Sequence, residues 1–398
     1  LFNGCSKAIK AGVDAIFSPG FVPSRAKFPH FHNPFPQVHR VAVLPFFNQS
    51  AEPTVDQDQI ALAYFNELQA IRGFEVLNNW PAEVGYGDPR YVRLGYMLIV
   101  VAAQVNACRR NIELGQSLGV DTRFAGPDEL KKIEPLLETD GLAGGAWEPN
   151  GGYIDVTRMV LSWLGAGQSR GLEVLSGVRV NAITTAAGKV SGIETAMGRI
   201  EAPIVVNATG AWATDLLAPI GVDVPIERRR LDMAYLVQPP GKANIGACIT
   251  DGNSNVVLRP DMGRHMLAVA YAGVMPEVAD PVGDAPAADH DAHLARIDKA
   301  FAERLPACRG AEVARNVSGA YDVTPDYHPI LGWAPNIDGL YLAVGFSGHG
   351  LKLSPAIGEV VASAVLGCEP AFDISALRPT RFAEGEEMYL AYGPSARA

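Results

Sequence analysis

The alternation of apolar and polar positions predicts helices and strands that follow one another along most of the chain. Apolar residues at helical spacing predict helices over residues 62–80, 105–118, 129–133, 158–168 and 292–304. Strand-like runs are expected at residues 93–100, 233–237, 256–258 and 266–269. Helices alternate with strands, and a β-rich block interrupts them. We therefore expect an α/β layer domain interrupted by an antiparallel-sheet domain, with a cleft between two lobes.

The β-rich block begins with three short runs between residues 174 and 206. Two compact turns separate them, at residues 187–189 and 197–199. This spacing predicts a three-stranded meander.

The start of the chain lacks the apolar periodicity of a helix and that of a strand. The chain begins with Leu1 instead of methionine and continues into residues 18–48, a segment rich in Pro, Phe and His. We expect residues 1–55 to be irregular and to represent a truncated or misread beginning. His30, His32 and His39 have no ligand-spaced partner, so a loop is the preferred interpretation over a metal site.

Composition narrows the class of protein. With 398 residues, of which 48% are hydrophobic and 19% charged, the chain has enough apolar material for two globular domains. Its net charge of −10 offers no global attraction for nucleic acid. The longest apolar run, residues 97–103, is far shorter than the roughly 20 residues that cross a bilayer. Five scattered cysteines without a C-x-x-C pair argue against a disulfide framework or zinc cluster and favour a reducing, cytoplasmic location.

The sharpest local signal is a strand, a glycine-rich turn and a helix near the C-terminus. A buried strand is expected at residues 339–344, and the turn Gly345-Phe-Ser-Gly-His-Gly-Leu-Lys352 follows it. We expect Ser354 to cap the next helix and Gly367 to end it. Glycines there let backbone approach a flat or anionic ligand at the positive end of a helix. For the three glycines alone, an ordinary tight turn is the alternative.

Two further segments carry related signals: one is a second strand, turn and helix, and the other is a polar segment rich in turn residues. Residues 203–206 read as a strand that passes through Asn207-Ala-Thr-Gly210 into a helix ending near Leu217. Residues 318–332 are polar and rich in turn residues, which predicts a site loop. Another pair of histidines, His290 and His293, is expected at the surface of the helix that ends near Arg304.

Together these three segments resemble the D-amino-acid oxidase family of FAD-dependent oxidoreductases, the group that includes glycine oxidase, sarcosine oxidase and dimethylglycine dehydrogenase. The resemblance also runs through residues 93–96, 128–135 and 141–153. It implies a Rossmann-like FAD-binding domain that is split in sequence and a substrate domain with a mixed or antiparallel sheet. The expected division assigns residues 56–90, 141–222 and 318–392 to the FAD-binding domain and residues 91–140 and 223–317 to the substrate domain.

The resemblance also implies positions for the cofactor. Val178 and Val180 would lie near the adenine, and Ala208, Gly210 and Trp212 beside the nucleotide half of FAD. The isoalloxazine would be lined by Gly345, Phe346, Ser347, Gly348, His349, Gly350, Leu351 and Lys352. Noncovalent FAD is expected, since Gly319 stands where monomeric sarcosine oxidases carry the cysteine that tethers flavin.

Four residues are the candidates for catalytic roles. Lys352 would favour an anionic reduced flavin, His349 would lie by the ring, and Tyr321 and Arg259 would contact the substrate. Tyr321 stands where relatives like glycine oxidase place an arginine for the substrate carboxylate. For Arg259, a salt bridge to Asp261 is an equal alternative. No metal is expected.

One family feature is missing from the sequence. The family begins with a strand, a G-x-G-x-x-G turn and a helix that hold the FAD pyrophosphate. Between residues 1 and 84 the only glycines here are Gly4, Gly12, Gly20 and Gly73, which cannot build a nest for two phosphates.

The leading hypothesis is an enzyme that oxidises the C–N bond of an amino acid or amine, such as sarcosine, dimethylglycine, glycine or proline. Hydride would pass to flavin N5, and the resulting imine would hydrolyse. An oxidase and a dehydrogenase are equally compatible, because the oxygen-activating lysine of sarcosine oxidases has no clear counterpart. Lobes of this family also occur in larger assemblies, so an oligomer or hetero-subunit is compatible too. The alternative is a non-catalytic or truncated homologue, or an accessory subunit, that does not bind FAD.

Overall fold

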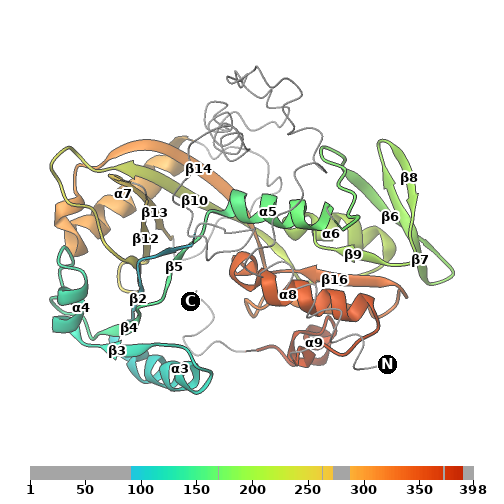
Figure 1. Ribbon diagram of the computed structural model, residues 1–398, viewed down its shortest axis with the longest axis horizontal. Helices are drawn as coiled ribbons and strands as arrows, with labels where there is room; N and C mark the ends of the chain where they lie inside the picture. The colour runs from blue at the N-terminus through green and yellow to red at the C-terminus, as the bar shows by residue number, and fades with distance from the viewer. Residues whose placement is uncertain (1–90, 169, 262, 272–286, 371–372, 389–398) are drawn as a thin grey trace.

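The computed structural model describes residues 91–388, apart from residues 169, 262, 272–286 and 371–372. Two lobes lie side by side in this part of the chain (Figure 1). One is built on an eight-stranded sheet, and the other combines two three-stranded sheets with helices. The expected mixture of helices and strands in an α/β, two-lobed fold is therefore confirmed. The irregular segment 1–55, its three histidines and the helix expected at residues 62–80 lie outside the described residues.

The eight-stranded sheet is mixed. Its strands pair antiparallel except for one parallel contact between β11 and β2. In spatial order they are β14 (Glu312–Val323), β10 (Glu227–Val237), β13 (His265–Ala270), β12 (Val256–Pro260), β11 (Cys248–Asp251), β2 (Tyr96–Ile99), β4 (Gly145–Glu148) and β3 (Arg123–Ala125).

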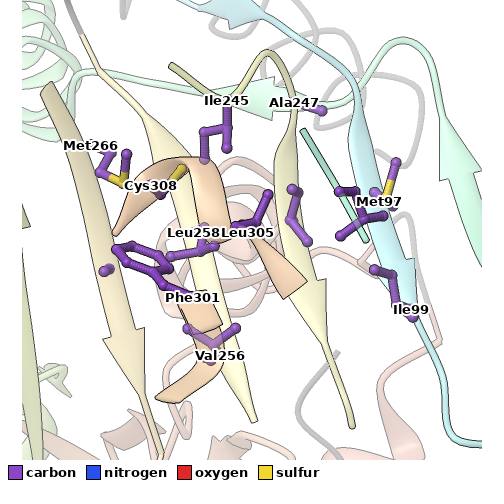
Figure 2. Close-up of a cluster of buried hydrophobic side chains, with 14 of the residues drawn as sticks. Met97, Ile99, Ile245, Ala247, Val256, Leu258, Met266, Phe301, Leu305 and Cys308 are labelled. Atoms are coloured by element: carbon purple, nitrogen blue, oxygen red, sulfur yellow. The ribbon is translucent and has the colours of Figure 1, made fainter. Parts of the chain in front are cut away.

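One face of this sheet carries the largest apolar core. Because side chains alternate along a strand, Met97, Leu258 and Met266 all point to the same side. There they meet Phe301 and Leu305, at the end of helix α7 (Ala287–Arg304) and just beyond it (Figure 2). Helix α4 (Pro127–Ile133) adds Leu130 to this core, and helix α3 (Val105–Ser117) covers a separate small cluster. That cluster contains Leu98 and Ala146, which point to the opposite face of the sheet, so α3 covers part of that face.

The second lobe has a shorter, partly parallel sheet. Strand β16 (Leu340–Val344) is buried throughout and pairs antiparallel with β15 (Ile330–Trp333) and parallel with β9 (Val205–Asn207). The predicted meander is confirmed as β6 (Val180–Ala186), β7 (Lys189–Thr195) and β8 (Gly198–Glu201). The other elements are β1 (Val92–Arg93), β5 (Gly152–Tyr153), α5 (Val156–Gln168), α6 (Ala213–Leu217), α8 (Gly350–Val365) and α9 (Arg381–Glu384).

The start of α8 differs from the prediction. The helix begins at Gly350, with His349 as its N-cap, so Ser354 and Pro355 lie inside it. Pro355 has no N–H for the carbonyl of Leu351, and the Ser354 hydroxyl donates a 2.6 Å hydrogen bond to that carbonyl instead. The helix can therefore run through the proline. Its end is as predicted, because Gly367 adopts φ +68° just after it.

The site loop predicted at residues 318–332 is wrong in its first half. Residues 318–323 belong to β14 and pair with Asp232 to Glu227 of β10. Their polar side chains suit a strand because each has a partner on its own face; Ser318, for example, donates a 2.7 Å hydrogen bond to Asp232. Residues 324–329 form the connection from β14 to β15.

The predicted surface position of His293 is also wrong. Its side chain is 1% exposed, and its Nε2 accepts a hydrogen bond from the N–H of Ala270 at 3.0 Å. The neighbouring His290 is half-buried, 3.2 Å from the hydroxyl of Ser318. Helical spacing alone does not say which face of α7 meets the sheet.

The strands of the eight-stranded sheet come from residues 92–148, of which β1 is not part of the sheet, and from residues 227–323. The strands of the two three-stranded sheets come from residues 180–207 and 330–344. The domain boundaries given above stay a prediction. Across the part of the chain that is described, no helix has both the length and the apolar character needed to cross a membrane.

A buried ion pair ties the connection after β14 to the C-terminal helix α9. Arg381 donates to Asp326 through Nε at 2.8 Å and through Nη2 at 3.0 Å, and both side chains are almost fully buried. Nη2 also reaches the carbonyl oxygen of His328 at 2.9 Å. Burial by itself raises the pKa of Asp326, but Arg381 and the N–H groups of His328 and Met388 outweigh it, so that the pKa is lowered.

Replacing Arg381 by methionine should destabilise the protein by about 3–5 kcal/mol, because the carboxylate of Asp326 is left buried and unpaired. Denaturant unfolding measures the change. The matched control is Arg123→Gln, which breaks the exposed pair with Glu129 and should cost less than about 1 kcal/mol. Equal effects of the two variants would contradict the assignment of Asp326–Arg381 as the stronger link.

The stability of the fold should fall as the pH drops from 6.5 toward 4. Burial lowers the pKa of His293 from 6.5 to about 4, so the unfolded chain binds the proton first in this range. At pH 4.5 the loss should reach about 2–3 kcal/mol. His293→Gln keeps an acceptor for Ala270 and should remove this part of the pH dependence in unfolding measurements at pH 7 and 4.5. An unchanged dependence would show that His293 is not its source.

Candidate functional site

The turn between β16 and α8 depends on its glycines. Gly345 and Gly348 have φ values of +71° and +86°, and Ser347 also has a positive φ of +53°. A Cβ atom on Gly345 would lie 2.5 Å from the methyl group of Thr324. Only a residue without a side chain fits there, so the buried Gly345 lets the turn pack closely against the connection that follows β14.

The carboxylate of Asp322 holds this turn from β14. Its Oδ2 accepts hydrogen bonds from the N–H groups of Gly345 at 2.8 Å and Phe346 at 3.1 Å. The backbone carbonyl of Asp322 accepts a third bond, from Ser347 at 3.2 Å, and the Ser347 hydroxyl accepts one from the N–H of Thr324. Burial raises the pKa of Asp322, and the N–H donors oppose this rise only in part.

The N-terminus of α8 opens from the end of this turn. No side chain caps it at His349, and its first turn contains no acidic residue. The first N–H groups of a helix have no acceptor within the helix and carry its positive dipole end. Lys352 lies in this first turn; its side chain is exposed, yet desolvation by the surrounding protein lowers its pKa. The region is therefore suited to a flat ligand that carries negative charge.

The turn after β9 lies beside the first one. Strands β9 and β16 are parallel neighbours, so their carboxyl ends meet at one edge of the sheet. Gly210 begins the short helical turn Gly210–Trp212, and a Cβ atom on it would lie 3.9 Å from Oδ2 of Asp322. The structure thus brings Ala208 and Gly210 next to the turn 345–348. Trp212 follows and is 39% exposed.

The residues expected near the adenine lie farther from this edge of the sheet. Val180 begins strand β6 of the meander, where it packs against the core of the second lobe, and Val178 precedes that strand.

Tyr321 projects from β14 onto this site. A Cβ atom on Gly348 would come within 2.5 Å of the Tyr321 ring, so the ring covers that glycine. Across the sheet, Tyr321 pairs with Arg229 of β10, which places both side chains on the same face. Nε of Arg229 donates to Glu227 at 2.9 Å. The sequence pattern did not single out Arg229, because its position beside Tyr321 depends on the pairing of β10 with β14.

The same face of the sheet continues as an apolar cluster in which Leu231, Val269 and Val323 are buried. The residues of this cluster come from β10, β12, β13 and β14 and from the segments that follow these strands. They are Leu231, Met233, Val257, Val269, Tyr271, Tyr321, Val323 and Tyr327. We call this set the cleft face. It is the side of the sheet opposite to the core that α7 covers.

Arg259 is not brought to Tyr321. It lies on β12, in register through Leu267 and Tyr235 with Arg315 of β14. Tyr321 is three strands and six residues away, which at about 4.8 Å and 3.3 Å per step is on the order of 20 Å. Arg259 lies 3.8 Å from Asp261 and stacks on the Tyr153 ring at 4.2 Å. The ion pair named as its alternative is present.

Described residues include no group of three or more His, Cys, Asp or Glu side chains placed to hold a metal ion. The residues that surround the 345–352 segment fit one half of a flavin cofactor. The exposed backbone at Gly348 suits a flat ring, and an uncapped helix end with Lys352 suits its negative edge. The pyrophosphate would need another nest, and residues 1–90 lie outside the described part.

Comparison with known proteins agrees with this geometry. Residues 53–364 match the family described as FAD dependent oxidoreductase, or DAO. Mitochondrial sarcosine dehydrogenase of Mus musculus is 28% identical over 291 residues, which are 70% of this chain and 31% of that protein. The chain therefore spans about a third of the length of this relative.

Two solved structures share the fold. L-proline dehydrogenase from P. horikoshii has a TM-score of 0.67 at 27% identity, with 75% of this chain and 79% of that chain covered. Glycine oxidase from Geobacillus kaustophilus has a TM-score of 0.63 at 22% identity, with 81% and 80% covered. Since the family match extends over most of the chain, this protein belongs to the DAO family of FAD-dependent oxidoreductases.

Proposed function

We propose that this chain is an FAD-dependent oxidoreductase that oxidises the C–N bond of a small amino acid or amine. The observation that carries the proposal is the turn 345–349, which Asp322 holds open at the N-terminus of α8 below the cleft face. Membership of the family and the similarity to sarcosine and proline dehydrogenases support the same reaction class.

The position of this turn indicates which residues would contact each part of the cofactor. Gly345 to Lys352 would hold the isoalloxazine, while Ala208, Gly210 and Trp212 would lie along the nucleotide half and Val178 and Val180 near the adenine. FAD, when bound, supplies the redox chemistry by accepting two electrons and a proton equivalent from the substrate carbon. The α8 N-terminus and Lys352 stabilise negative charge placed beside them. Gly319 has no thiol, which is consistent with noncovalent binding.

The cleft face determines what the substrate can be. Its apolar side chains favour an uncharged group on the substrate, such as a methyl group or a saturated ring. Arg229, beside Tyr321, is paired with Glu227, and a substrate carboxylate would take the place of that partner; no arginine stands at position 321 itself. Sarcosine, dimethylglycine and proline combine one carboxylate with such an apolar group, so we favour them over glycine. His349 precedes the helix, and Arg259 is too distant to share this substrate with Tyr321.

A second candidate function is retained because of one observation. The glycines needed for a pyrophosphate nest are missing between residues 1 and 84. A homologue that keeps the lobes but does not bind FAD, or an accessory subunit, would be consistent with this.

Titration of the purified chain with FAD should produce a bound flavin spectrum, and anaerobic addition of substrate should bleach it. Sarcosine, dimethylglycine and proline should bleach it faster than glycine. Pyrrolidine, which is proline without the carboxylate, should act at least about tenfold more slowly if Arg229 contributes a charge-assisted contact. A chain that stays colourless in excess FAD would refute the enzyme and support the non-catalytic alternative. Equal rates for proline and pyrrolidine would remove the role of Arg229.

Gly348→Val should abolish FAD binding. The branched side chain would need φ +86° and would collide with the Tyr321 ring, so the turn must move. Gly358→Ala is the matched control in the helix that follows, because a Cβ atom there meets open space and φ is ordinary; it should leave binding unchanged. Flavin absorbance after gel filtration reports both. Retained colour in Gly348→Val would contradict the placement of the ring at this turn.

A further inference from the structure

Asp322 is a buried carboxylate to which no step of the proposed reaction assigns a role. It lies near the end of β14, and through its side chain and its own carbonyl it accepts hydrogen bonds from three consecutive residues of the turn, Gly345, Phe346 and Ser347. Its Oδ2 is also the nearest group to Gly210 of the second turn. One side chain of the eight-stranded sheet therefore holds one turn of the other lobe and lies close to the second.

We propose that Asp322 is the positioning residue of the cofactor turn and that its negative charge tunes the electron affinity of the ring bound there. The second part rests on the proposed function, whereas the first does not. The turn needs such a residue because Ser347, which is not a glycine, has a φ of +53°, a conformation that surrounding contacts must hold.

The two hydrogen bonds to Oδ2 make it possible to separate the effect of the shape of the Asp322 side chain from the effect of its charge. Oδ2 alone accepts both N–H groups, so the single carbonyl oxygen of an asparagine can take the same two bonds. Asp322→Asn then removes the charge and keeps the shape. Asp322→Ala removes both and leaves the N–H groups of Gly345 and Phe346 buried without an acceptor.

The charge of Asp322 also explains which backbone N–H groups of the turn are used inside the protein. Two of its N–H groups end on Asp322, so they are turned away from a ligand, while the uncapped N-terminus of α8 remains directed toward it. A negative charge on the far side of the turn opposes the positive helix end. Removing that charge should make it easier to place electrons on a ring bound at the turn.

Hydrogen–deuterium exchange on the full chain without FAD tests the positioning role. In Asp322→Ala, uptake by peptides covering residues 345–352 should rise at least about tenfold in rate, and in Asp322→Asn it should stay within about threefold of the parent. Unchanged exchange in Asp322→Ala, or equal exchange in both variants, would overturn the positioning role. This measurement holds even if the chain does not bind FAD, so its failure and that of the proposed function are distinguishable.

The FAD-loaded chain tests the role of the charge. Asp322→Asn should bind FAD with nearly parental affinity but show a more positive midpoint potential, whereas Asp322→Ala should bind FAD at least about tenfold more weakly. An unchanged or more negative potential in Asp322→Asn would overturn the tuning role.

A matched control separates these effects from a general loss of stability. Asp251 is another buried aspartate, at the end of β11 in the same eight-stranded sheet, where it accepts hydrogen bonds from the N–H of Asn253 at 2.9 Å and the hydroxyl of Ser254 at 2.6 Å. Asp251→Asn should leave both the exchange of residues 345–352 and the flavin potential unchanged. If it shifts either as Asp322→Asn does, the assignment to Asp322 is overturned.

Discussion

Two backbone N–H groups of a glycine-rich turn end on one oxygen of Asp322, and the geometry of the site depends on that contact. Backbone donors buried in a loop must find acceptors, and a turn with several positive φ angles cannot supply them from its own helix or strand. The acceptor comes from β14, the strand that reaches from the eight-stranded sheet to the other lobe. The contact therefore sets the turn, directs the N-terminus of α8 and joins the two lobes at the same point.

Several of the buried polar groups in the described residues lie near the same junction. The ion pair between Asp326 and Arg381 joins the connection after β14 to the C-terminal helix α9. The hydrogen bond between Thr324 and Ser347 joins the same connection to the cofactor turn. Such groups are costly to bury and are kept only where their partners are complete. The directional bonds at this junction add to the apolar cores that hold the two lobes on either side.

Much of the fold could be predicted from local patterns. The helices at residues 105–118 and 158–168, the meander and the buried strand at 340–344 all follow from periodicity and turn chemistry, which act over a few residues. Errors appear where distant segments intervene. The strand from residue 318 to 323 looked like a loop because its polar residues have partners in β10 and in the turn at 345, far away in sequence. His293 looked exposed because nothing local reveals which side of α7 meets the sheet.

The amino-acid sequence determined the glycine turn, the helix that follows it and the family, because these depend on residue types at short, fixed spacing. Only the tertiary structure decided that Asp322 holds the turn, that Arg229 stands beside Tyr321 and that Arg259 stands far from both. Those relations arise from strand register, and register is set by the packing of whole sheets, which no short segment contains.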